Sequence, residues 1–337
     1  MVPHSGLDRA VPQSAEQTTA NLDSEHQQCM FPSTMRVALL SGGVGGARAA
    51  RAINNLDHDL TAIVNVGDDA PAYGLQVSPD LDTVMYTLAD VAGDAGWGVA
   101  HDSFSLMDRM ASFGIDTGFR IGDKDLATKL LRTSLVGQGV SLSDVTSRLA
   151  ETFNLDVTLL PATNDPLATM IQTESGWIDF RTYFVTRRHQ DRVLDVRFDG
   201  VARARPAPSV IEAIEASDVV IIAPSNPPLS IWPTLAIPGV SRAVQRAKRV
   251  IAISPLFGGK ALKGPADRVL GSLGFSPGNK GVVEAYDGLL TDLIVDQADA
   301  LDQALLGTPH LRVHVTNTKM TTIKEGRSFG SWLTHLL

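Results

Sequence analysis

Continuous apolar runs recur along the chain and are separated by longer segments with helical periodicity. A run without polar interruption is typical of a strand buried on both faces of a parallel sheet, whereas a strand with one exposed face alternates. The pattern therefore predicts a Rossmann-like α/β fold, a doubly wound and mainly parallel sheet with helices on both faces. The runs lie at residues 36–40, 60–64, 218–223, 250–253 and 292–295, and a last strand and helix fill 311–337.

Two stretches interrupt this alternation. Residues 97–154 are predicted to form a helical insertion, with Asp125 as the N-cap of a helix over 125–135. Residues 157–201 are predicted to form a β-rich insertion of antiparallel strands at 157–160, 169–173, 178–186 and 193–198. The side chains expected to face inward from the helical insertion are Phe104, Leu106, Met107, Met110, Leu126, Leu130 and Leu131.

The segment before the first predicted strand has a different composition. Residues 1–34 lack a hydrophobic period, contain three prolines and are rich in Gln, Ser and Thr. This composition predicts a disordered N-terminal tail, followed by a single α/β domain over residues 35–337. We expect deletion of residues 1–34 to leave activity intact.

Composition narrows the class of protein. With 337 residues, 44% hydrophobic and 20% charged, the chain is ordinary for a globular protein, and its net charge of -8 argues against a nucleic-acid surface. The one cysteine, Cys29, excludes an internal disulfide, and no apolar run approaches the roughly 18 residues of a membrane span. We expect a cytoplasmic protein whose partners are small molecules rather than nucleic acid or membrane.

Four glycines follow the first predicted strand without a spacer: Gly42, Gly43, Gly45 and Gly46. Without Cβ atoms, their backbone N–H groups can approach an anion at the positive end of the helix that follows. A P-loop would need Lys and Ser or Thr after the last glycine, and the spacing also fails the dinucleotide fingerprint G-x-G-x-x-G. The turn is predicted to bind phosphate in neither common manner; the alternative is a tight connection without a ligand.

Acidic side chains follow the second predicted strand. Asp68 and Asp69 lie at its carboxyl end, and Asp82 lies in the next loop. Since neighbouring strand ends face one crevice, these oxygens predict Mg²⁺ held by Asp68, with Asp69 or Asp82 assisting, together with ligand phosphate. Pro79 is expected to end regular structure, and Asp80 equally suits a helix cap. Solvated loop charges are the alternative.

Two further loops carry candidate ligand contacts. Arg120 and Lys124 flank a glycine at a predicted helix start, where they either complement an anionic substrate or balance neighbouring acids. The Pro-rich loop after the third apolar run places Ser225, Asn226 and Ser230 at another strand end. A rigid polar loop positions a base or phosphate with little loss of entropy, although it also suits a stiff connector.

Six motifs follow one another in order between residues 35 and 299. They are Ser41-Gly42-Gly43-Val44-Gly45-Gly46-Ala47, Asn65-Val66-Gly67-Asp68-Asp69, Ser78-Pro79-Asp80-Leu81-Asp82-Thr83, Gly122-Asp123-Lys124-Asp125-Leu126-Ala127-Thr128, Pro224-Ser225-Asn226-Pro227 and Ser254-Pro255. In this order and spacing they resemble the 2-phospho-L-lactate transferases of deazaflavin coenzyme (F-420) biosynthesis. Each motif alone is weak, but six in register are specific.

The resemblance implies a reaction. Family members transfer the acid-bearing phosphoryl group from a guanosine diphosphate ester of phospholactate, or of phosphoenolpyruvate in some bacterial members. The acceptor is the ribityl hydroxyl of the deazaflavin FO, and GMP is released. A magnesium-dependent transferase of this kind needs a metal between carboxylates and diphosphate, because phosphoryl transfer depends on positioning and charge compensation.

The resemblance also assigns roles to residues. The glycine turn and Ser225, Asn226 and Ser230 would hold the guanosine diphosphate. Asp82 and Arg120 would contact the deazaflavin, and we place Lys124 with them. Asp68 and Asp82 are the expected catalytic residues, with Asp68 and Asp69 as metal ligands.

Two departures from the family pattern leave the transferred acid open. Trp232 stands where many relatives have glycine, which would narrow the nucleotide pocket. Arg181 stands where an amide is usual and is a candidate partner for the carboxylate of the transferred acid. Phospholactate, phosphoenolpyruvate and phosphoglycerate donors all remain possible.

Two other classes of function compete with the transferase. Asp68 lies 23 residues after Gly45, near the ribose-binding acid of a nicotinamide-dependent oxidoreductase, but the failed fingerprint weighs against that class. A non-catalytic nucleotide-binding module would need the Gly-rich and Pro-rich loops but not the aspartates. We expect the protein to form a homodimer.

Overall fold

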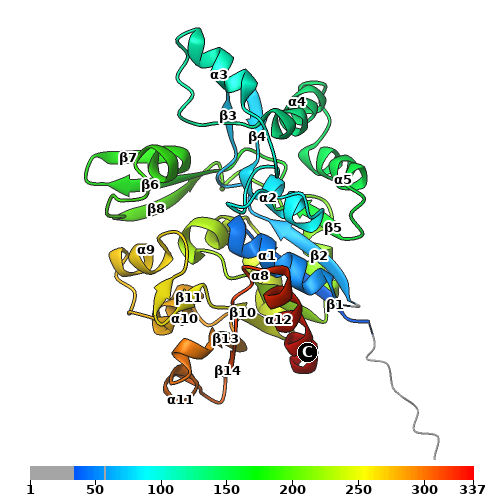
Figure 1. Cartoon of the computed structure of the whole chain (residues 1–337). Coiled ribbons are helices and arrows are strands. Elements are labelled where there is room, and N and C mark those ends of the chain that lie inside the picture. The colour runs from blue at the N-terminus through cyan, green and yellow to red at the C-terminus, as the bar shows by residue number, and fades with distance from the viewer. Residues whose placement is uncertain (1–33, 57) are drawn as a thin grey trace, which may run out of the picture. The chain divides into compact units, whose positions relative to one another are not determined.

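A seven-stranded sheet lies at the centre of the computed structural model, which describes residues 34–56 and 58–337 (Figure 1). The strand order is β14-β13-β10-β9-β1-β2-β5, and every neighbouring pair is parallel. This confirms the predicted doubly wound α/β fold. The strands are β1 (Arg36–Ser41), β2 (Asp59–Val64), β5 (Thr158–Pro161), β9 (Val219–Ile222), β10 (Val250–Ile253), β13 (Asp292–Asp296) and β14 (Arg312–Thr316).

The chain builds this sheet outward from β1 in two directions. It first adds β2 and β5 on one side, and later adds β9, β10, β13 and β14 on the other side. The direction therefore reverses between β1 and β9, whose register pairs Leu40 with Ile222. In open α/β sheets, ligands bind outside the carboxyl ends of the strands at such a reversal. The fold thus directs attention to the loops that follow Ser41 and Ile222.

The apolar runs form strands because both of their faces are covered. Residues 37–41 of β1, and all of β9 and β10, are at most 1% exposed. Helix α1 packs against α2 and α12, α6 packs against α8, and helices cover both faces of the sheet. The helices outside the insertions are α1 (Gly43–Asn54), α2 (Pro79–Leu88), α6 (Val210–Ala216), α7 (Trp232–Ala236), α8 (Val240–Arg246), α9 (Ala266–Ser272), α10 (Asn279–Ala285), α11 (Asp302–Leu306) and α12 (Ile323–Leu336).

The helical insertion is present, but its buried faces differ from those predicted. Of the four side chains expected to face inward from the first helix, only Met107 is buried, and Leu130 is 52% exposed. The second helix instead buries Lys129 and Arg132, because acids from another helix pair with them. Apolar periodicity alone could not show this polar interface. The three helices are α3 (Ser105–Ser112), α4 (Asp123–Gly137) and α5 (Leu142–Thr152).

The starts of α3 and α4 cap each other. Asp123, the first residue of α4, accepts hydrogen bonds from the first two backbone N–H groups of α3, at 2.9 and 3.1 Å. Asp102, from the loop before α3, accepts from the N–H groups of the second and third residues of α4, at 2.7 and 3.0 Å. The predicted N-cap role of Asp125 is therefore wrong, since Asp102 provides that cap.

The β-rich insertion is a small antiparallel sheet in the order β7-β6-β8. Two predictions about it are wrong. Strand β5 belongs to the central sheet, because it pairs in parallel with β2. The strand expected over 178–186 ends at Asp179, whose carboxylate accepts from the N–H (2.9 Å) and hydroxyl (2.6 Å) of Thr182 and so starts a helical turn. These elements are β6 (Ala168–Thr173), β7 (Gly176–Asp179), η1 (Thr182–Thr186) and β8 (Asp195–Asp199).

Two short hairpins and two helical turns complete the described part of the chain, and residues 34–337 form one compact unit. The predicted tail lies outside the described residues, apart from residue 34. Among the described residues, every helix is too short or too polar to cross a bilayer. The hairpins and turns are β3 (Ala70–Ala72) with β4 (Leu75–Val77), β11 (Leu256–Phe257) with β12 (Lys260–Ala261), η2 (Pro227–Ile231) and η3 (Gln297–Asp299).

Candidate active site

The glycine turn joins β1 to α1 at the reversal point of the sheet. A methyl group added to Gly42 would lie 2.7 Å from Asp80 Oδ2. A methyl group on Gly45 would overlap a carbonyl of the loop after β9, and one on Gly46 would overlap the last side chain of β1. Gly43 has a φ of +61°, which favours glycine. Close packing therefore requires these glycines whether or not the turn also binds a ligand.

The loop after β9 closes onto this turn. The Ser225 hydroxyl donates to the Gly42 carbonyl (2.6 Å), and the Gly42 N–H donates back to Ser225 Oγ (3.3 Å). Ser230 also lies against Gly42, 2.9 Å from the position of an added methyl group. The side-chain amide of Asn226 is buried, and neither its oxygen nor its nitrogen has a hydrogen-bond partner among the described residues. The structure thus brings the predicted nucleotide residues together.

Asn65 links two buried carboxylates beside the turn. Its Nδ2 atom donates to Asp68 Oδ1 (3.1 Å) and to Asp80 Oδ2 (3.0 Å). Helix α2 begins at Pro79, because proline suits the first helical position, and it therefore carries Asp80 within its first turn. The expectation that Pro79 ends regular structure is wrong. Asp80, which the sequence left as a possible cap, belongs to the acidic cluster.

Burial dominates the protonation of these acids. It raises the pKa of Asp68 well above the ordinary value, and the neighbouring Asp80 and Asp69 raise it further. Burial also raises the pKa of Asp80 to about 6, although Asn65 and the backbone N–H of Gly43 oppose the shift. The pKa of Asp69 is raised by burial too, against a hydrogen bond from Ser78. Each of these carboxylates is therefore held at an energetic cost without a ligand.

Asp69 keeps one oxygen free. Its Oδ2 atom accepts a hydrogen bond from the Ser78 hydroxyl (2.6 Å), whereas Oδ1 is buried and has no partner among the described residues. A buried carboxylate oxygen without a donor is costly, and such an atom points to an unfilled interaction with a cation or a hydroxyl.

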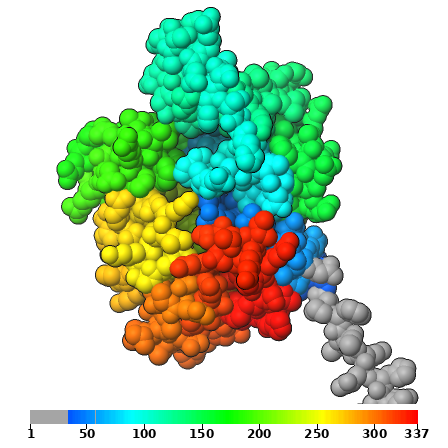
Figure 2. All heavy atoms as spheres, viewed as in Figure 1, coloured from blue at the N-terminus to red at the C-terminus, as the bar shows by residue number. Residues whose placement is uncertain are grey.

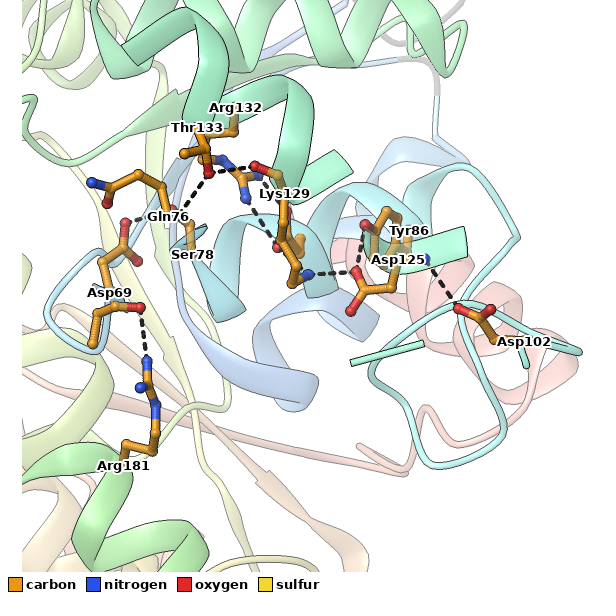
Figure 3. A network of polar contacts seen from close by, with 12 residues as sticks. Asp69, Gln76, Ser78, Tyr86, Asp102, Asp125, Lys129, Arg132, Thr133 and Arg181 are labelled. Atoms are coloured by element: carbon orange, nitrogen blue, oxygen red, sulfur yellow. Dashed lines mark hydrogen bonds and ion pairs between the residues drawn. The ribbon is translucent and has the colours of Figure 1, made fainter. Parts of the chain in front are cut away.

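Asp82 has a different environment from the other three acids. It pairs with Lys129 Nζ (2.9 Å) and with Arg132 of α4, and all three side chains are buried. Figure 3 shows the two cationic side chains projecting from α4. Burial alone would raise the pKa of Asp82, but Arg132 and Lys129 more than reverse this effect, so its pKa lies below the ordinary value. Lys129 also pairs with Asp125, which accepts from the hydroxyl of Tyr86 (2.7 Å).

Sequence reasoning missed the roles of Lys129 and Arg132. They lie four and seven residues after Asp125, so the three side chains share one face of α4. A charged stripe at helical spacing is the signal that would have found them, provided that the face was known to be buried.

The predicted deazaflavin residues lie on the helical insertion. Arg120 pairs with Asp108 (2.6 Å) on the surface and stacks over the ring of Phe104 at 4.8 Å. The Nζ atom of Lys124 donates to the carbonyls of Ala100 (3.2 Å) and His101 (2.7 Å). Neither side chain forms a hydrogen bond or ion pair with Asp82, whose partners on α4 are Lys129 and Arg132.

The β-rich insertion also holds the acidic turn. Arg181 donates to the carbonyls of Ala70 (2.7 Å) and Pro71 (2.8 Å), directly after the paired acids. Figure 3 shows Arg181 pointing toward the turn that carries Asp69. The N–H of Thr169 donates to the Gly67 carbonyl at 2.6 Å. In Figure 2 a hollow lies between this green insertion and the cyan segment that includes α2. Arg181 therefore directs two of its N–H groups to the backbone that follows the paired acids.

Comparison with known proteins identifies the family. The model of the family described as 2-phospho-L-lactate transferase CofD matches residues 37–321, which include every residue of the site. The chain belongs to the CofD family. The family resemblance predicted from the six motifs is thereby confirmed, and it favours a transferase over the oxidoreductase alternative.

Relatives within the CofD family carry two names. The chain is 34% identical over 301 residues to a 2-phospho-L-lactate transferase of Methanosarcina acetivorans, which covers 88% of this chain and 98% of that protein. It is 39% identical over 276 residues to a phosphoenolpyruvate transferase of Streptomyces griseus, which covers 79% and 87%. The CofD family therefore includes proteins named for two different acids.

A solved structure supports the fold. A member of the UPF0052 family from Bacillus halodurans superposes with a TM-score of 0.57 at 18% identity, covering 88% of this chain and 90% of that chain. At this identity the similarity concerns the fold alone. The overall fold is thus shared with this solved structure.

Proposed function

We propose that this protein transfers the phosphoryl group bearing a three-carbon acid from a guanosine diphosphate-activated donor to the ribityl hydroxyl of a deazaflavin, releasing GMP, in coenzyme F-420 biosynthesis. The observation that carries the proposal is the family match over residues 37–321, together with relatives named for this transfer. The convergence of the glycine turn, Asn226 and the acids at the reversal point of the sheet supports it.

The nucleotide would lie across the ends of β1 and β9. The start of α1 offers backbone amides and the positive end of a helix to a diphosphate. Asn226 offers a carbonyl oxygen and an NH₂ group side by side, both buried and without a hydrogen-bond partner among the residues that the structure describes. A guanine edge presents a carbonyl oxygen next to an N–H, which complements such an amide. Ser225 and Ser230 would fix the loop that carries it.

A magnesium ion would fit between these acids and the phosphate oxygens of the nucleotide. Among the described residues, no three acidic, His or Cys side chains converge as a complete metal centre. Mg²⁺ needs only one or two carboxylates when phosphate oxygens and water complete its shell. Asp68 and Asp69 would hold it, since among the described residues Asp69 Oδ1 lacks a hydrogen-bond partner and neither acid takes part in an ion pair. The ion would offset the charge of the diphosphate and the leaving group.

The chain's own residues would perform the transfer as follows. Asp68 would take the proton from the ribityl hydroxyl as that oxygen bonds to the phosphorus bearing the acid. The bond between this phosphorus and the bridging oxygen breaks, and GMP leaves with the electron pair. Asp82, fixed by Lys129 and Arg132, would orient the acceptor, and Arg120 and Lys124 would bind the deazaflavin from the helical insertion.

Melting temperatures would distinguish the candidate functions. The protein is heated with GDP, with NADH and with the deazaflavin, each with and without Mg²⁺, because a ligand that binds the folded state raises the melting temperature. We expect GDP and the deazaflavin to raise it, and GMP to appear only when activated donor and deazaflavin are both present. Stabilisation by NADH alone would favour an oxidoreductase, and nucleotide binding without GMP release would favour a non-catalytic module.

A further inference from the structure

The anion position at the start of α1 already contains a carboxylate of the same chain. Asp80 Oδ2 lies 2.7 Å from the place of a Cβ atom on Gly42, and its Oδ1 lies 3.9 Å from that place on Gly43. The carboxylate is therefore against the first residues of the helix, where a bound phosphate would also lie. Asp80 is 5% exposed and sits in the first turn of α2, so α2 carries it there as part of the fold.

In the part of the chain that the structure describes, no cationic side chain forms an ion pair with this carboxylate. None of the ion pairs among the described residues includes Asp80, Asp68 or Asp69. Asp80 and Asp68 share only the amide of Asn65. The same α2 turn carries Asp82, which has two cationic partners. Within one turn of α2, Asp82 therefore has cationic partners, whereas Asp80 takes part in none of these ion pairs.

Unsatisfied polar atoms at the glycine turn and in the acidic cluster indicate that a ligand completes this region. Ser41, at the end of β1, is 1% exposed, and its hydroxyl has no partner among the described residues. Asp69 Oδ1 is likewise buried without a partner. One atom can donate and the other needs a cation or donor, which together suit a phosphate accompanied by a divalent ion.

We propose that Asp80 couples nucleotide binding to a divalent cation. The inference rests on the nucleotide site proposed above. A diphosphate at the start of α1 faces the charges of Asp80 and Asp68 at close range, so its binding without a metal ion is weak. A divalent cation between the carboxylates and the diphosphate turns this repulsion into attraction, and Asp80 thereby makes the nucleotide and the ion bind together.

The test is calorimetric titration of GDP into the full chain, first with EDTA and then with excess Mg²⁺. We expect Mg²⁺ to strengthen binding to the wild type at least tenfold. Asp80→Asn keeps the shape and removes the charge, so it should bind GDP in EDTA at least tenfold more tightly than the wild type, with a smaller gain from Mg²⁺. Asp144→Asn, in the first turn of α5 and exposed, is the matched control and should behave as the wild type.

The outcomes separate this inference from the proposed function. If Asp80→Asn binds GDP no better than the wild type in EDTA and gains as much from Mg²⁺, Asp80 does not couple the two ligands and the inference fails alone. If the wild type does not bind GDP even with Mg²⁺, the proposed nucleotide site fails as well. Asp80→Ala, checked for folding by thermal melting, repeats the measurement if the Asn variant does not fold.

Discussion

The two ends of the central sheet treat buried acids in opposite ways. At the amino end of β13, Asp292 accepts from Arg249 (3.2 and 3.3 Å), Arg312 (2.8 Å) and His314 (2.7 Å). Its side chain is fully buried, and these partners hold its pKa far below the ordinary value despite burial. At the carboxyl end, the hydrogen-bond partners of Asp80 among the described residues are the Asn65 amide and the backbone N–H of Gly43, and its pKa is raised to about 6.

This difference in cationic partners indicates separate roles for the two ends of the sheet. A buried carboxylate surrounded by cations is already satisfied, so it can join strands but has little to offer a ligand. A buried group of carboxylates without cations is costly in isolation and becomes favourable only when a cation arrives. The chain is acidic overall, so the placement of its few buried cations decides which acids remain available.

The largest effect on activity is expected at the carboxyl end of the sheet, where Asp68 lies. Asp68→Asn should lower turnover roughly 100- to 1,000-fold, because it removes a metal ligand and proton acceptor from the transition state. GDP binding should be largely retained. The measurement is GMP release under saturating donor and deazaflavin, with Asp144→Asn as control. Near-normal turnover would remove Asp68 from the catalytic residues.

At the amino end of the sheet, the loss of an acid should lower the stability of the fold. Asp292→Asn leaves Arg249 and its neighbours without their counter-charge and should lower the free energy of unfolding by about 3–5 kcal/mol. Urea denaturation measures the loss. Asp218→Asn, which breaks an exposed pair with Arg36, should change it by less than about 1 kcal/mol. Equal losses in the two variants would contradict the contrast.

The two ends should also respond to pH in opposite directions. A carboxyl group with a raised folded pKa contributes stability below its unfolded pKa and loses it as the pH rises through the folded value. Asp80 should therefore cost the metal-free protein up to about 3 kcal/mol between pH 4 and pH 7. Thermal melts in EDTA should show this decline, and Asp80→Asn should reduce it. Asp292, with its lowered pKa, loses stability only below about pH 4.

The smallest stability effect is expected on the surface of the helical insertion. Arg120→Ala breaks an exposed pair with Asp108, so the free energy of unfolding should change by less than about 1 kcal/mol. If Arg120 binds the deazaflavin, the KM for that substrate should rise while the affinity for GDP stays constant. An unchanged KM would assign Arg120 to surface charge balance instead.

The sequence predicted best what depends on local pattern. The apolar runs gave the strands of the sheet, and the four glycines marked the turn at its reversal point, since both signals lie within a few consecutive residues. The different environments of Asp80 and Asp82 could not be predicted, because they depend on which side chains distant segments of the chain place beside each acid. Arg132 bonds to Asp82 across 50 residues of sequence, whereas no ion pair among residues 34–56 and 58–337 includes Asp80. The exposed face of α3 and the turn after Asp179 were missed for a related reason: apolar and β-branched residues were assumed to be buried or extended.

The exchange of caps between α3 and α4 has a consequence for motion. Asp123 of α4 accepts from the first amides of α3, and Asp102 before α3 accepts from the first amides of α4, so the two helix starts hold each other in place. Separating them would expose unbonded amides on both sides at once, and neither helix start can fray while the other stays fastened. Opening of this segment is therefore an all-or-none event rather than a gradual loosening.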